Sequence, residues 1–84
     1  MAGERIVVLG LDPGSRCTGF GLVSEESGRL ELIQTGTVRP ELRLPLSDRL
    51  GTIYAQLSQL IVAYTPDEAA VEDVFVSRNT SSAL

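Results

Sequence analysis

Residues 5–14 of the chain read RIVVLGLDPG. The run is nearly all apolar and rich in β-branched side chains, and it ends at Asp12-Pro13-Gly14, a common turn signal. Such a run is typical of a strand that is covered on both faces. We therefore expect residues 5–11 to form a central strand of a sheet.

Two further extended segments follow this strand. Residues 18–24 (TGFGLVS) come after a short turn rich in Gly, Ser and Arg, and residues 25–28 (EESG) predict a second turn before residues 29–39. The third segment alternates only partly, but its end, TGTV at residues 35–38, favours an extended conformation. Together the three segments predict an antiparallel meander.

The clearest helix in the sequence follows a loop at residues 40–45. Ser47 is a suitable N-cap, and Asp48 stands in the first turn, where a negative charge is favourable. Residues 65–67 (TPD) end the helix. Between these signals, apolar residues recur at helical spacing and predict one apolar stripe: Leu46, Leu50, Ile53, Leu57, Leu60, Ile61 and Tyr64.

Residues 68–74 (EAAVEDV) predict a fourth strand. Because a strand, a crossover helix and a strand in one sheet normally form a right-handed unit, we expect this strand to lie parallel to the first. Residues 79–84 (NTSSAL) have the pattern of a helix cap and first turn. A single turn does not stabilise itself, so we expect the chain to be part of a longer domain.

Length and composition exclude several classes of protein. The chain has 84 residues, 43% hydrophobic and 21% charged, so it is of globular type and forms one domain or part of one. It has neither an apolar run long enough to span a membrane nor an export signal. The single cysteine, Cys17, excludes an intramolecular disulfide and favours a reducing cytosolic setting. The net charge of −4 argues against simple electrostatic adhesion to nucleic acid.

Two carboxylates are the candidates for chemistry. Asp12 follows the first strand directly, and Glu72 lies near the carboxyl end of the fourth, where functional groups of open α/β sheets gather. Asp12 shares strand parity with Gly10, and Glu72 with Ala70, so both side chains project to one place if these faces coincide. Paired carboxylates select Mg²⁺ or Mn²⁺, and a complete two-metal site hydrolyses phosphodiesters. Alternatively, Asp12 only opens a turn and Glu72 is a solvated charge.

Two motifs in register resemble the RuvC-type Holliday junction resolvases. The first is LGLDPGSRCTGFG at residues 9–21; the second is VEDVF at residues 71–75, followed by Asn79 and by Ser82-Ala83-Leu84. The resemblance covers essentially the whole chain. It implies a ribonuclease-H-like α/β fold with a mixed sheet, in which a three-stranded antiparallel meander and a crossover helix precede a fourth strand parallel to the first. Residues 1–84 would form the N-terminal part of a single nuclease domain.

The same resemblance implies an activity. The family consists of homodimeric endonucleases that cut four-way DNA junctions symmetrically with two Mg²⁺ ions per active site, in homologous recombination and DNA repair. Mn²⁺ is an alternative ion, the location is cytoplasmic without a membrane partner, and a branch-migration helicase complex is the expected protein partner. The family's two remaining catalytic aspartates lie on a C-terminal helix that would fall beyond Leu84. We therefore expect the 84-residue chain to be inactive by itself.

For the metal site, the resemblance matches Asp12 and Glu72 to the first two acidic ligands of the family. Asp73 stands beside Glu72, but its opposite parity on the strand predicts that it points to the other face. We therefore do not expect Asp73 to be a ligand.

For DNA binding, the resemblance matches five further residues. Phe75 corresponds to an aromatic side chain that approaches unstacked bases, with a position in the core as the alternative. Arg78 and Asn79 fall in the segment that meets DNA near the crossover. Ser15 and Arg16 lie close enough to the expected metal to contact a phosphate, although a role in the turn explains them equally well.

The sequence leaves two alternatives to the resolvase open. An ATP-binding module of the actin, sugar-kinase and Hsp70 type shares the fold, and Asp12-Pro13-Gly14 to Gly19 also satisfies its first phosphate loop. The spacing of Glu72, Phe75 and Asn79 favours the resolvase, because the ATP-binding pattern does not require it. A third possibility is a non-catalytic fragment that self-associates through exposed apolar surface.

Overall fold

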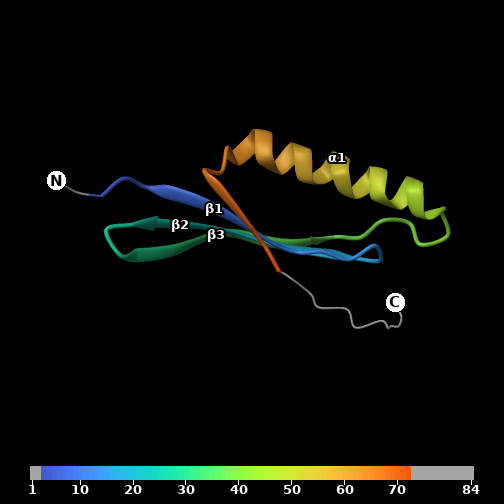
Figure 1. The fold of residues 1–84 in the computed structure, drawn as a ribbon, viewed down its shortest axis with the longest axis horizontal. Helices are drawn as coiled ribbons and strands as arrows, with labels where there is room; N and C mark the ends of the chain where they lie inside the picture. Colours follow the sequence, from blue (N-terminus) through green and yellow to red (C-terminus); the bar gives the residue numbers. More distant parts are fainter. Residues whose placement is uncertain (1–2, 73–84) are drawn as a thin grey trace, which may run out of the picture.

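A computed structural model describes residues 3–72 of the chain. In this range a four-stranded mixed sheet packs against one helix (Figure 1). The elements, in chain order, are β1 (Ile6–Asp12), β2 (Thr18–Glu26), β3 (Arg29–Val38), α1 (Leu46–Tyr64) and β4 (Glu68–Val71). The sheet order is β3-β2-β1-β4, with β1 and β2 antiparallel, β2 and β3 antiparallel, and β4 parallel to β1. The predicted meander and the predicted parallel fourth strand are both confirmed.

A two-residue turn joins β2 to β3. Ser27 and Gly28 both have positive φ angles, 54° and 81°, the combination that suits the right-handed twist of a hairpin. The Glu25 side chain accepts a hydrogen bond from the N–H of Gly28 at 2.7 Å. The turn predicted at residues 25–28 is therefore shorter than expected, because β2 continues through Glu26.

A β-bulge explains why the third strand alternates only partly in sequence. The register of β2 and β3 shifts between Leu22, which pairs with Gln34, and Val23, which pairs with Leu32. Ile33 is thus one extra residue on β3, so Leu32 and Gln34 point to opposite faces although they are two positions apart.

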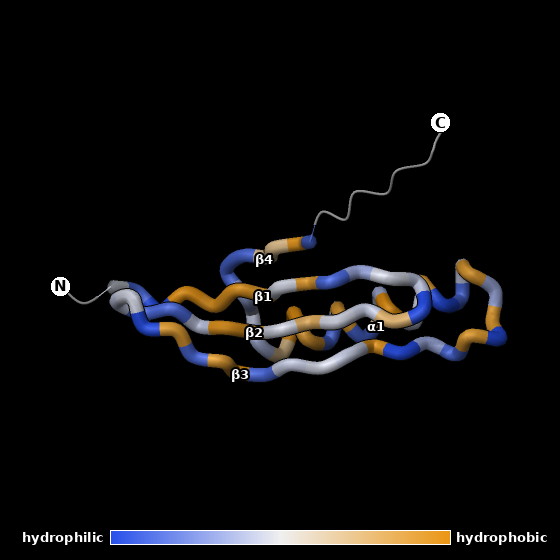
Figure 2. Tube along the Cα trace, turned by 90° about the horizontal axis from the view of Figure 1, so that it is seen from below, coloured by the Kyte–Doolittle hydropathy of each residue, from blue (hydrophilic) through white to orange (hydrophobic). Residues whose placement is uncertain are grey.

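The helix covers one face of the sheet. Val7, Leu9 and Leu22 are buried beneath it, and Ile53 is the buried residue of α1. Figure 2 looks onto the other face, with α1 behind the sheet. On that side Val8 is only half-buried. The expectation that the first strand is covered on both faces therefore does not hold within residues 3–72, where α1 shields a single face.

The predicted helix is present, but its predicted N-cap is wrong. The helix begins at Leu46, and the N-cap is Pro45, whose carbonyl oxygen accepts hydrogen bonds from the N–H groups of Asp48 and Arg49. Ser47 lies inside the first turn, because the fixed φ of Pro45 already sets the entry of the chain. Asp48 is in the first turn as predicted, and Thr65, in a left-handed conformation, ends the helix at the predicted position.

The apolar stripe of α1 is only partly buried. Leu57, Leu60 and Tyr64 are half-buried, whereas Leu46 and Leu50 are 50% exposed. In the described part of the chain, α1 is not apolar enough to cross a membrane. The predicted fourth strand is described as far as Val71, so its expected continuation to residue 74 and the expected helix start at residues 79–84 lie outside the described residues.

Candidate metal and DNA site

The register of the two parallel strands brings Asp12 and Glu72 to one corner of the sheet. Gly10 pairs with Ala70 and Leu11 with Val71, so Asp12 and Glu72 are the next positions along the two strands. The N–H of Glu72 donates to the carbonyl oxygen of Leu11 at 2.9 Å, which extends the ladder past Val71. Since side chains alternate between faces, both carboxylates belong to the face that carries Gly10 and Ala70. The two faces therefore coincide, which is the condition under which the parity of the sequence brings the two side chains together.

These carboxylates lie on the face opposite α1. Asp12 and Glu72 are both exposed. A depression of about 610 Å³ follows this face from Val8 to Asp12 and is floored by glycines at positions 10, 19 and 21. Small residues here leave open space next to the Asp12 carboxylate, where a hydrated cation or a phosphate can approach.

The loop after Asp12 is tightly closed on itself. The buried hydroxyl of Thr18 donates to the carbonyl oxygen of Gly14 at 2.8 Å and accepts from the N–H of the same residue at 3.3 Å. A Cβ atom at position 14 would lie 2.6 Å from the carbonyl oxygen of Cys17. Only glycine therefore fits at position 14, and the Asp-Pro-Gly sequence is more than a generic turn. Cys17 is a free, half-buried thiol.

Arg49, which was not among the predicted site residues, links the same loop to the helix. Its guanidinium donates to the carbonyl oxygen of Ser15 at 3.4 Å and to that of Leu44 at 3.2 Å. The spacing of the helix could have predicted this role. Arg49 stands four positions before the buried Ile53, so this charged residue lies on the packed side of the helix. Ser15 and Arg16 are exposed in the loop that Arg49 holds.

A third set of contacts anchors the start of β4. The Asp67 carboxylate accepts from the N–H of Val7 at 2.8 Å, and the N–H of Asp67 donates to the carbonyl oxygen of Val7 at 2.7 Å. These two hydrogen bonds fix the register of the β1–β4 pair at the end that lies away from Asp12 and Glu72. Asp67 therefore contributes to the site by alignment of the strands.

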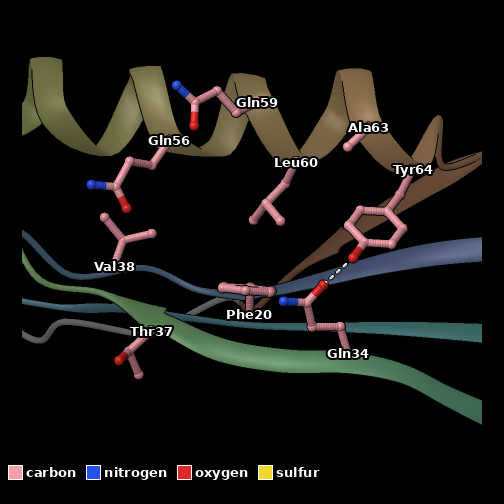
Figure 3. Close-up of a pocket in the computed structure, with 9 residues that line it drawn as sticks. All are labelled: Phe20, Gln34, Thr37, Val38, Gln56, Gln59, Leu60, Ala63 and Tyr64. Atoms are coloured by element: carbon pink, nitrogen blue, oxygen red, sulfur yellow. Dashed lines mark hydrogen bonds between the residues drawn. The ribbon is translucent and has the colours of Figure 1, made fainter.

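A separate cavity of about 390 Å³ lies between α1 and the β2–β3 side of the sheet (Figure 3). Its lining includes neutral amides from Gln56 and Gln59 and the hydroxyl of Tyr64, which donates to the side-chain oxygen of Gln34. Neither Asp12 nor Glu72 lines this cavity. It lies on the helix side of the sheet and is distinct from the carboxylate corner.

Within residues 3–72, no group of three or more metal-ligating side chains is present. Asp12 and Glu72 supply two sets of carboxylate oxygens, which are the hard ligands that Mg²⁺ and Mn²⁺ prefer. The residues present thus fit part of a divalent-cation site. Three of the predicted DNA-binding residues, Phe75, Arg78 and Asn79, lie outside the described residues, as does Asp73.

Comparison with known families shows which family the chain belongs to. The family described as crossover junction endodeoxyribonuclease RuvC matches residues 8–84 of this chain. The chain belongs to the RuvC family. The RuvC of Oleidesulfovibrio alaskensis is 52% identical over 84 residues, covering 100% of this chain and 50% of that protein. The RuvC of Nitratidesulfovibrio vulgaris strain DP4 is 49% identical over 79 residues, covering 94% of this chain and 47% of that protein.

Solved RuvC structures share the fold. Thermus thermophilus RuvC in complex with a Holliday junction substrate superposes with a TM-score of 0.79 at 28% identity, covering 90% of this chain and 49% of that one. The chain thus spans about half the length of the RuvC proteins that it matches. This similarity confirms the predicted ribonuclease-H-like mixed sheet.

The fold also occurs outside the RuvC family. A Ppx/GppA family protein from Aquifex aeolicus superposes with a TM-score of 0.62 at 15% identity, covering 81% of this chain and 26% of that one. At this identity the likeness concerns the fold alone. The match to RuvC over residues 8–84 favours the resolvase over the ATP-binding alternative.

Proposed function

We propose that residues 1–84 are the N-terminal part of a single ribonuclease-H-like nuclease domain in an enzyme that resolves Holliday junctions. One observation carries the proposal: in a chain of the RuvC family, the β1–β4 register sets Asp12 and Glu72 side by side at the carboxyl ends of two parallel strands. This is the edge of an open α/β sheet where catalytic groups gather. The membership of the family supplies the substrate class.

Asp12 and Glu72 are proposed as ligands of Mg²⁺, with two ions in the complete active site and Mn²⁺ as a substitute. Such ions supply phosphodiester hydrolysis by activating a water and stabilising the leaving oxygen. The role of this chain is to hold the two carboxylates in register and to leave the glycine-floored depression open for the DNA backbone. Because two carboxylates alone do not complete the ligand set, further acids must come from outside residues 3–72.

The proposed DNA contacts surround this corner. Ser15 and Arg16 are exposed in the loop next to Asp12, and we propose that they contact a phosphate. Phe75, Arg78 and Asn79 follow Glu72 in the chain and are proposed to contact unstacked bases and the backbone near the crossover. Because the net charge of the chain is −4, we propose that its DNA contacts come from individual arginines and that the rest of the protein supplies much of the basic surface.

Three features of the whole protein are proposed on the basis of family membership. The enzyme acts as a homodimer, works in the cytoplasm during recombination and repair, and cooperates with a branch-migration helicase complex. Symmetric cleavage of two opposing strands requires two active sites, which a dimer with two-fold symmetry provides.

The experiment that tests the proposal is Asp12→Asn in the full-length resolvase that carries this chain. We expect cleavage of a synthetic four-way junction to be abolished and junction binding to persist, because binding depends on phosphate and shape contacts rather than on the metal ligands. Asp48→Asn in the first turn of α1 is the matched control and should retain cleavage. Loss of binding together with cleavage would contradict the role assigned to Asp12.

A further inference from the structure

Thr18 is a buried polar residue at the start of β2. It is 2% exposed and pairs across the sheet with Val38, which is also 2% exposed. A buried hydroxyl must find partners, because an unpaired polar group in the interior is costly. Thr18 finds both of its partners in the backbone of one residue, Gly14.

The two hydrogen bonds close a loop, residues 14–18, that begins just after Asp12-Pro13. Gly14 is two residues after Asp12, and Gly19, which pairs with Asp12 in the β1–β2 ladder, is one residue after Thr18. The Thr18 hydroxyl therefore links the segment just after Asp12 to the residue just before Gly19, the pairing partner of Asp12. Besides the ladder itself, the loop receives a hydrogen bond from Arg49, which donates to the carbonyl oxygen of Ser15 at 3.4 Å.

We propose that Thr18 is a positioning residue for the carboxylate of Asp12. This inference rests on the proposed function, in which Asp12 holds a divalent cation. A metal ligand is effective only when its own position is fixed by surrounding hydrogen bonds. Thr18 does this through the backbone: it fixes Gly14, and Gly14 limits the directions that Asp12 can take.

The alternative is that Thr18 only fills space beneath the sheet. Thr18→Val separates the two roles, because valine keeps the branched shape and removes the hydroxyl. Thr18→Ser retains the hydroxyl and removes the methyl group. Val38→Ala is the matched structural control, since it removes a buried side chain opposite Thr18 without touching the loop.

The test uses the full-length resolvase and two measurements besides cleavage. Calorimetric titration of the metal-free protein with Mn²⁺ should show an affinity about 10-fold weaker for Thr18→Val, as is typical when a residue that orients a metal ligand is lost. Amide hydrogen exchange in the metal-free protein should be faster at Gly14. Thr18→Ser and Val38→Ala should both bind Mn²⁺ as the parent does, even though Val38→Ala melts at a lower temperature.

The outcomes distinguish this inference from the function on which it rests. If Asp12→Asn weakens Mn²⁺ binding but Thr18→Val does not, the positioning role is wrong and the metal site stands. If Asp12→Asn itself binds Mn²⁺ as the parent does, the metal site is wrong. Should Thr18→Val fail to fold while Thr18→Ser and Val38→Ala fold, Thr18→Ala provides the same titration without the branched side chain, and unchanged binding there also refutes the inference.

Discussion

The backbone N–H of Glu72 donates to the carbonyl oxygen of Leu11, with 2.9 Å between nitrogen and oxygen. This bond continues the parallel ladder one step beyond Val71, the last residue of β4. Glu72 therefore keeps the alternation of the strand, and its side chain shares a face with Ala70 and Asp12. A backbone fixed in this way is the support that a metal ligand requires.

The alternation predicts different outcomes for two neighbouring acids. In the full-length resolvase, Glu72→Gln should lower the rate of junction cleavage by at least about 100-fold, since even residues that only orient a metal ligand are worth 10–100-fold. Asp73→Asn should retain cleavage, because the sequence predicts that a side chain next to Glu72 on an extended strand points to the other face. Single-turnover cleavage of a labelled four-way junction measures both. Equal losses in the two variants would show that the strand does not discriminate between these acids.

The tight loop predicts opposite effects for two glycines. Gly14→Ala should lower the free energy of unfolding by about 1–3 kcal/mol, because its Cβ would lie 2.6 Å from the carbonyl oxygen of Cys17. Gly51→Ala in α1 meets no atom within 4 Å and should raise that free energy by up to about 1 kcal/mol through better helix propensity. Urea denaturation of the full-length protein tests both, and a neutral Gly14→Ala would contradict the described loop.

The packing of α1 predicts where the helix is sensitive. Ile53→Ala should cost about 2–5 kcal/mol of unfolding free energy, because it removes the buried side chain of α1. Val62→Ala, at a position that is 77% exposed, should change the stability by less than about 0.5 kcal/mol. Thermal and urea unfolding of the full-length protein compare the pair. Similar costs at both positions would mean that α1 packs on a different face.

The 84-residue chain by itself should not cleave four-way junctions at any Mg²⁺ concentration. Residues 3–72 offer no group of three metal-ligating side chains, and two carboxylates leave a two-metal site incomplete. The measurement is a cleavage assay with the full-length resolvase as the positive control. Cleavage by the short chain that disappears in its Asp12→Asn variant would show that these residues suffice.

Much of the fold was predictable because its signals are local and strong. The apolar run ending at Asp12 predicts β1, the helical spacing around Ile53 predicts α1, and the handedness of the crossover predicts that β4 is parallel to β1. The pairing of Asp12 with Glu72 followed from strand parity once that topology was assumed.

Other features depend on contacts that a linear pattern does not contain. Ser47 has the composition of an N-cap, but Pro45 determines where the helix starts. The bulge at Ile33 depends on the register with β2 and is visible in the sequence only as broken alternation. The roles of Thr18 and Arg49 depend on backbone oxygens in the loop after Asp12, which bear no side-chain signature.

The parallel pairing of β1 with β4 also constrains biosynthesis. The ribosome makes Asp12 early and Glu72 only after the whole of α1, so a nascent polypeptide that has emerged as far as the meander carries one carboxylate without the other. Formation of the β1–β4 pair must await the crossover helix, since parallel strands cannot be joined by a tight turn. A growing chain therefore cannot bring Asp12 and Glu72 together until β1, α1 and β4 have all been made.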